Sequence, residues 1–154
     1  MKVLIVYDSV YGNTEKIARA IAGALTPSYE VRVLRAGEAN PPELESIDLL
    51  IVGSPTQGGR PTPAIQDFLN KVQEPALKDI NVSAFDTRFS GVKRTLAGVF
   101  GYAAGRIADS LKRKGGTLIV SPEGFLVKGT KGPLEEGELE RAAGWAKGIV
   151  EIKK

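Results

Sequence analysis

The sequence contains no cysteine and no histidine among its 154 residues. Without cysteine, the chain forms no disulfide, no thiolate metal site and no cysteine nucleophile. Without histidine, it lacks the most common general base and the most common metal ligand in proteins. We therefore expect any redox or group-transfer chemistry to come from a bound cofactor rather than from side chains.

Long apolar runs are also missing, and neither sign of charge dominates. No run approaches the length that spans a membrane, and the chain does not open with the pattern of a signal peptide, so we expect a cytoplasmic protein without a membrane partner. The formal charge is only +3, and the basic residues are spread along the chain, which disfavours nucleic-acid binding. The length and the 42% hydrophobic content fit one globular domain over residues 1–154, which we expect to be a monomer.

An apolar run over residues 2–7 is followed by the turn 8–14 and then by a helical pattern from residue 15. Such a turn places unpaired backbone N–H groups at a helix N-terminus, which is a geometry that binds phosphate. The fingerprints G-x-G-x-x-G and G-x-x-x-x-G-K-[ST] are absent. The turn carries no cation before Lys16, so we expect neutral hydrogen bonds to hold the anion. An ordinary connection capped by Ser9 or Asn13 is the alternative.

Strand and helix patterns alternate along the rest of the chain. We expect strands over residues 29–34, 47–53, 81–85 and 117–120, with 125–127 as a continuation of the last, and a loop over 35–46. Helices are expected from residue 62 or 63 until Pro75, over 102–114 and over 138–152. This alternation predicts an α/β fold with a parallel sheet between two helix layers. In such a sheet the loops after the first, third and fourth strands meet at one edge, where ligands bind.

The first of these loops resembles the FMN-phosphate loop of the flavodoxin family. Ser9, Val10, Tyr11, Gly12, Asn13 and Thr14 stand at the positions that bind the cofactor in that family. Val10 and Tyr11 replace two family threonines, and Ser-x-Tyr-Gly is also similar to the loops of flavodoxin-like quinone reductases and of flavo-diiron flavodoxin modules. The resemblance implies a flavodoxin-like three-layer sandwich with a five-stranded sheet in the order 2-1-3-4-5. The short segment 129–137 makes the chain similar to short-chain members.

The other two loops extend the resemblance and depart from it. Cofactor contacts are expected from Ser54, Pro55, Thr56, Gln57, Gly58 and Gly59 in the second loop, and from Asp86, Thr87, Arg88, Phe89, Ser90 and Gly91 in the third. Gln57 replaces an aromatic residue that stacks on the flavin. The resemblance implies that the Gly58 peptide flips to meet N5–H of the one-electron-reduced flavin; a merely flexible loop is the alternative. Phe89 is the best candidate to cover the ring, unless it is a core side chain, and Trp145 receives no cofactor role.

Three functions are compatible with these residues. The leading one is a low-potential FMN electron carrier that exchanges electrons with transient protein partners. The second is an FMN-dependent NAD(P)H:quinone reductase, in which Arg60 and Arg88 hold a nucleotide phosphate. The third, a phosphoacceptor signalling domain, needs an aspartate where Gly53 and Ser54 stand.

The charges of the second and third loops predict an unusual redox poise. Arg60 and Arg88 lie in these loops, and Lys93 and Arg94 follow the third. Positive charge near the ring stabilises the reduced anion. We expect a second reduction potential that is less negative than in an acidic flavodoxin, and a partner with an acidic surface.

Overall fold

The computed structural model describes residues 1–90 and 102–153. Strands and helices alternate as the sequence predicts. The strands are β1 (Lys2–Tyr7), β2 (Glu30–Arg35), β3 (Leu49–Pro55), β4 (Asn81–Phe89), β5 (Thr117–Leu118) and β6 (Glu123–Val127). The α-helices are α1 (Asn13–Leu25), α2 (Pro63–Lys71), α4 (Ala103–Arg113) and α5 (Glu138–Lys153). Two short 3-10 helices, Ala36–Glu38 and Pro41–Leu44, lie where we expected a loop.

The sheet is parallel and has the order β2-β1-β3-β4-β5, so the predicted topology is confirmed. The last position in the sheet is shared by two short strands. β5 pairs with Asn81 and Val82 at the start of β4, and β6 pairs with its second half, from Phe85 to Phe89. The expected continuation of the last strand after Pro122 is therefore present as β6.

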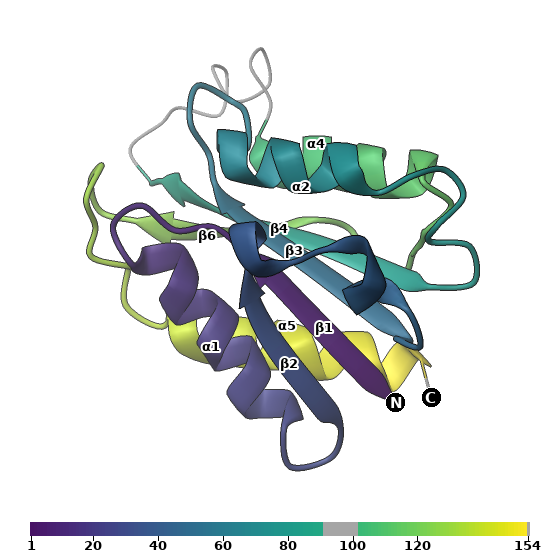
Figure 1. Cartoon of the computed structure of the whole chain (residues 1–154). Helices are drawn as coiled ribbons and strands as arrows, with labels where there is room; N and C mark the ends of the chain where they lie inside the picture. Colours follow the sequence, from purple (N-terminus) through teal and green to yellow (C-terminus); the bar gives the residue numbers. More distant parts are fainter. Residues whose placement is uncertain (91–101, 154) are drawn as a thin grey trace.

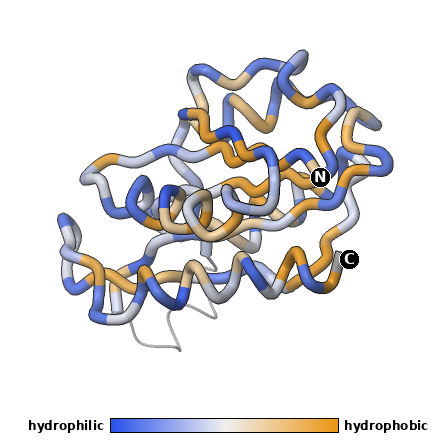
Figure 2. Tube along the Cα trace, turned by 90° about the horizontal axis from the view of Figure 1, so that it is seen from below, coloured by the Kyte–Doolittle hydropathy of each residue, from blue (hydrophilic) through white to orange (hydrophobic). Residues whose placement is uncertain are grey.

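Among the described elements, α1 and α5 cover one face of the sheet, and α2 and α4 cover the other (Figure 1). The middle strands β1 and β3 are apolar over most of their length because both of their faces are buried. The edge strand β2 is only partly buried, and its exposed positions alternate with half-buried ones. Figure 2 shows the helix at the C-terminus changing between hydrophobic and hydrophilic along its length, as expected for a helix with one buried face.

A close contact between two strands explains the glycine at the end of the apolar run in β3. A Cβ at Gly53 would lie 2.0 Å from Cζ of Phe85, so only glycine lets the two strands pair. Phe85 in turn packs edge-to-face against Phe125 and Trp145. Trp145 therefore belongs to the core beneath α5, away from the loops expected to bind a cofactor.

The fourth strand is longer than the sequence predicts. We expected a loop from Asp86 onwards, but β4 runs to Phe89 because β6 pairs with it there. The third cofactor segment is therefore a strand end, and Gly91, Lys93 and Arg94 lie outside the described residues. Within residues 1–90 and 102–153, no helix is long and apolar enough to cross a membrane.

Candidate functional site

A cavity of about 220 Å³ lies at the edge of the sheet where β1, β3 and β4 end. Four segments line it: the turn before α1, the end of β3, the end of β4 and the chain around the end of β6. The lining residues are Val10, Tyr11, Asn13, Thr14, Pro55, Thr56, Gln57, Thr87, Arg88, Phe89, Val127 and Thr130. The three loops predicted from the sequence therefore meet at one site.

The turn before α1 has the geometry of an anion cradle. Gly12 at the helix N-cap has φ +91°, a conformation that glycine adopts without strain. The Ser9 hydroxyl accepts the amides of Gly12 and Glu15 at 3.0 and 3.3 Å, which fixes the turn. Within the described chain, no acceptor meets the amides of Val10, Tyr11, Asn13 or Thr14. These donors at a helix N-terminus fit a phosphate group.

Arg35 is a residue of this region that the sequence analysis missed. It ends β2, and the parallel register places it beside Tyr7, immediately before the turn. Its guanidinium donates to the Ser9 carbonyl at 3.2 Å and lies 3.6 Å from the Asp8 carboxylate and 3.5 Å from that of Glu15. Arg35 therefore offsets two negative charges next to the cradle, although the turn itself contains no cation. The strand register was the signal that could have revealed it.

The end of β3 is anchored by its hydroxyl groups. Ser54 is fully buried, and its Oγ accepts the amide of Thr62 just before α2 at 3.0 Å. The Thr56 hydroxyl accepts the Ala103 amide at the start of α4, also at 3.0 Å. Thr56 thus joins the cavity wall to α4, whereas Ser54 does not line the cavity.

The residues that follow form a tight hairpin turn. Gln57 and Arg60 exchange backbone hydrogen bonds of 2.8 and 3.0 Å. Gly58 and Gly59 between them have φ +57° and φ +80°, the pattern of a type I′ turn. Gln57 lines the cavity, and both glycines lie beside it without lining it.

Only one peptide group in this turn is without a partner among the described residues. The Gln57 carbonyl accepts the Arg60 amide, and the Gly59 carbonyl accepts Nε of Arg106 at 2.9 Å. Among the residues that the structure describes, none donates to the Gly58 carbonyl and none accepts from the Gly59 amide. The peptide between Gly58 and Gly59 can therefore rotate without breaking a hydrogen bond to those residues.

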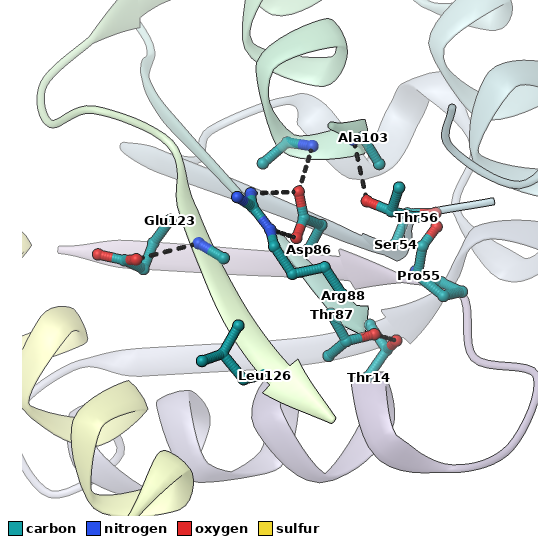
Figure 3. A network of polar contacts seen from close by, with 12 residues as sticks. Thr14, Ser54, Pro55, Thr56, Asp86, Thr87, Arg88, Ala103, Glu123 and Leu126 are labelled. Carbon is teal, nitrogen blue, oxygen red and sulfur yellow. Dashed lines mark hydrogen bonds and ion pairs between the residues drawn. The ribbon is translucent and has the colours of Figure 1, made fainter. Parts of the chain in front are cut away.

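The end of β4 is joined to the two other loops. The hydroxyls of Thr14 and Thr87 are 2.8 Å apart (Figure 3). The Thr56 amide donates to the Thr87 carbonyl at 2.9 Å. Phe89 is 45% exposed, so it is not a core side chain. Tyr11 is 50% exposed on the opposing segment. Large apolar side chains exposed around a cavity are typical of a ligand site.

Asp86 and Arg88 form an ion pair beside the cavity (Figure 3). Nε and Nη2 of Arg88 donate to the two carboxylate oxygens of Asp86 at 2.7 and 2.8 Å, and the Ala104 amide donates to the same carboxylate at 2.9 Å. Burial raises the pKa of Asp86, while Arg88 and the amide oppose the rise. The guanidinium also stacks on Tyr102, 3.3 Å from the ring centre.

This pair corrects our expectation for the charges around the site. We counted Arg88 as a free positive charge near the ring, but its charge is matched by a fully buried carboxylate. Asp86 does not line the cavity either; it fixes the start of α4 and the position of Arg88. Of the cations that carried the prediction, Arg60 remains within the described chain.

The fourth wall was not anticipated from the sequence. Val127 and Thr130 line the cavity, and Asn13 donates to the Lys131 carbonyl at 3.2 Å. A Cβ at Gly132 would lie 2.7 Å from the Asn13 amide group, so the chain passes directly over that residue. Asn13 therefore holds this wall against the cradle. The glycines of segment 129–137 were the available signal, because close backbone approach favours glycine.

The predicted site residues divide into three groups. Those that line the cavity are Val10, Tyr11, Asn13, Thr14, Pro55, Thr56, Gln57, Thr87, Arg88 and Phe89. Those that shape it from behind or beside it are Ser9, Gly12, Ser54, Gly58, Gly59, Asp86 and Ser90. In the last of these, the hydroxyl donates to the Val127 carbonyl at 3.0 Å. Gly91 lies outside the described chain. The amide cradle and the exposed aromatic walls together fit a phosphorylated planar cofactor such as FMN.

Comparisons with known proteins agree with this geometry. The flavodoxin family model matches residues 5–145. A flavodoxin of Clostridium beijerinckii is 33% identical over 104 residues, which are 66% of this chain and 67% of that protein. The crystal structure of oxidised Flavodoxin 2 from Bacillus cereus superposes with a TM-score of 0.83 at 25% identity, covering 98% of this chain and 99% of that one.

A different kind of relative is much longer than this chain. Putative diflavin flavoprotein A 4 of Synechocystis is 36% identical over 106 residues, which are 66% of this chain and 15% of that protein. The chain spans 12% to 18% of the diflavin flavoproteins that it matches. The family match over nearly the whole sequence is decisive: the chain belongs to the flavodoxin family, whose members bind FMN and transfer electrons to redox partners.

Proposed function

We propose that this chain is an electron carrier that binds FMN in the cavity at the carboxyl edge of the sheet. FMN supplies the redox chemistry when bound, and the protein supplies position and electrostatics. The observation that carries the proposal is the juxtaposition of an amide cradle at the start of α1 with exposed aromatic side chains across the same cavity.

The phosphate is assigned to the turn between Ser9 and Thr14. The four amides that meet no acceptor among the described residues point to this position. The Ser9 hydroxyl can add a donor because the bonds it accepts leave its proton free. Arg35 strengthens the assignment because it pairs with the nearby carboxylates of Asp8 and Glu15, which would otherwise repel a phosphate.

The flat ring system is assigned to the space between the first turn and the ends of β3 and β4. Tyr11 and Phe89 are the side chains available to cover it, since Gln57 stands where the family has an aromatic residue. The Gly58 carbonyl is assigned to the edge of the ring because its peptide has no hydrogen bond to a described residue that rotation would break. Arg88 cannot move toward the ring without leaving Asp86 unpaired.

The cavity wall suits electron transfer better than acid–base catalysis. Among the described lining residues there is no carboxylate and no lysine, and the chain has no histidine or cysteine. Of the groups that commonly act as general acids or bases, the described wall supplies only the Tyr11 phenol, which suits a site whose redox chemistry the cofactor carries. The proposal includes a monomeric, cytoplasmic protein and a transient redox-protein partner, which size-exclusion chromatography and cell fractionation would check.

Turnover with NAD(P)H tests the proposal against the reductase alternative. The FMN-loaded protein is mixed with NADH or NADPH and a quinone, without any other enzyme. An electron carrier should show no sustained oxidation of the nucleotide until a separate flavoprotein reductase is added. Sustained turnover by the chain alone would contradict the proposal and establish the quinone reductase.

A further inference from the structure

The arginines of the described chain differ in whether a carboxylate accompanies them. Five form ion pairs: Arg19, Arg32, Arg35, Arg88 and Arg141. Arg60 and Arg113 lie within 4.0 Å of no carboxylate that the structure describes, and both are exposed. These two arginines line the same cleft.

This cleft lies between α2 and α4 and has a volume of about 210 Å³. Pro61, Leu69 and Ser110 are buried along it. The exposed lining residues all carry hydrogen-bond donors: Arg60, Gln66, Asn70, Arg106 and Arg113. No carboxylate belongs to the described lining, so the cleft presents positive charge and amide groups to solvent.

The cleft is joined directly to the proposed flavin site. Arg106 donates to the Gly59 carbonyl in the turn that borders the cavity, and Arg60 closes the same turn. Arg113 follows Arg106 by seven residues, so it lies two helical turns further along α4, about 10.5 Å away. The nearest acid on this helix, Asp109, is engaged 3.6 Å from Lys112. The positive charges thus form a line that begins beside the cavity.

We propose that this cleft is the docking surface for a redox partner that presents a cluster of aspartate and glutamate side chains. The inference rests on the proposed function, and it specifies where the partner binds. Carboxylates on the partner would pair with Arg60 and Arg113 while the Gln57–Arg60 turn, and with it the edge of the flavin site, faces the partner. Weak, charge-guided contacts of this kind suit transient association.

A pyridine nucleotide fits the same charges less well. No aromatic side chain belongs to the described lining to stack a nicotinamide or adenine ring. The polar, exposed rim also resembles the rim of a protein interface more than a cofactor pocket.

The test is a titration of the FMN-loaded, ¹⁵N-labelled protein with a hexaglutamate peptide at low salt. We expect amide shifts at residues 60, 66–70 and 106–113 that vanish at 0.15 M salt. Arg60→Gln combined with Arg113→Gln should weaken binding at least about fivefold, as the loss of two exposed ion pairs allows. The control, Arg19→Gln with Arg32→Gln, removes the same net charge elsewhere and should change affinity less than about twofold.

Three results would overturn the docking surface. These are an absence of shifts at the cleft, an equal loss of affinity in both double variants, or NADPH shifting the same amides more strongly than the peptide does. The last result would assign the cleft to a nucleotide. FMN affinity is measured for each protein in parallel, so a failure to bind FMN refutes the proposed function without deciding the docking result.

Discussion

Substitution of Gly58 tests the turn beside the flavin site. A side chain there has space, so only the positive φ of the backbone disfavours it. Gly58 has φ +57°, and a Cβ there would meet no atom within 4 Å. Valine strongly disfavours this region because it is β-branched, whereas asparagine enters it readily. Gly58→Val and Gly58→Asn therefore add side chains of similar size, and only the valine opposes the conformation.

The size of the expected effect follows from the free energy that a residue other than glycine loses in the left-handed conformation, which is about 1–2 kcal/mol. The present turn is of type I′, and rotating the Gly58–Gly59 peptide gives type II′, which keeps φ positive at Gly58. With no reduced ring to meet, the oxidised protein can relax this strain by leaving both turn types, but the reduced protein must keep one of them to present the Gly58 carbonyl. We expect the valine variant to have a first reduction potential about 40–90 mV below that of the asparagine variant, at 59 mV per tenfold change.

The assays are spectroelectrochemical titration of the FMN-loaded variants and denaturant unfolding of the proteins without cofactor. Because the protein without reduced FMN can relax the strain, the valine variant should lose less than about 1 kcal/mol of unfolding free energy relative to the asparagine variant. Equal first potentials in the two variants would show that another group meets the reduced ring. A loss of the full value of about 1–2 kcal/mol would show that the strain is also present without reduced FMN, in which case it could not lower the first potential.

Four further perturbations test other parts of the account. Ser9→Ala and Thr14→Ala should each weaken FMN binding by about 1–3 kcal/mol, the effect of losing a hydrogen bond to a charged group; unchanged affinity in both would place the phosphate elsewhere. Arg60→Gln should lower the second reduction potential at low salt and less at high salt. Arg88→Gln should instead destabilise the protein by about 3–5 kcal/mol, because it leaves a buried carboxylate unpaired. A second potential that Arg60→Gln leaves unchanged would refute the role of Arg60, and an Arg88→Gln protein as stable as the wild type would refute the role of Arg88. Hydrogen bonds from Arg141 hold the pKa of Glu138 below its ordinary value of 4.5. The ionised Glu138 carboxylate therefore stabilises the fold above that pH, and this contribution is lost as the pH falls through the lower pKa of the folded state. Glu138→Gln should therefore flatten the acid side of the stability profile, and an unchanged slope would contradict the assignment.

The sheet and the first turn were predictable because local patterns determine them. The apolar runs of β1 and β3 are buried on both faces, and the turn between Ser9 and Thr14 joins a strand to an amphipathic helix. The strand order came from the family resemblance, and the structure confirms it. Convergence of the three loops then followed from the geometry of a parallel sheet.

Features that depend on contacts between distant segments were not predictable from the pattern. β4 runs past Asp86 because β6, more than 30 residues later, supplies its partners. Asp86 and Arg88 are two residues apart on one strand face, a spacing that permits an ion pair, but burial of the carboxylate depends on the start of α4. Arg35 reaches the first turn only because β2 lies beside β1.

Titration of the cofactor-free protein with FMN, followed by flavin fluorescence and absorption, tests the central claim most directly. The account predicts saturable binding of one FMN per chain, and it predicts weaker binding for Thr14→Ala than for the wild type. A protein that leaves the fluorescence and spectrum of added FMN unchanged would contradict the assignment of the cavity. Binding that the Ser9 and Thr14 variants leave intact would contradict the placement of the phosphate at the start of α1.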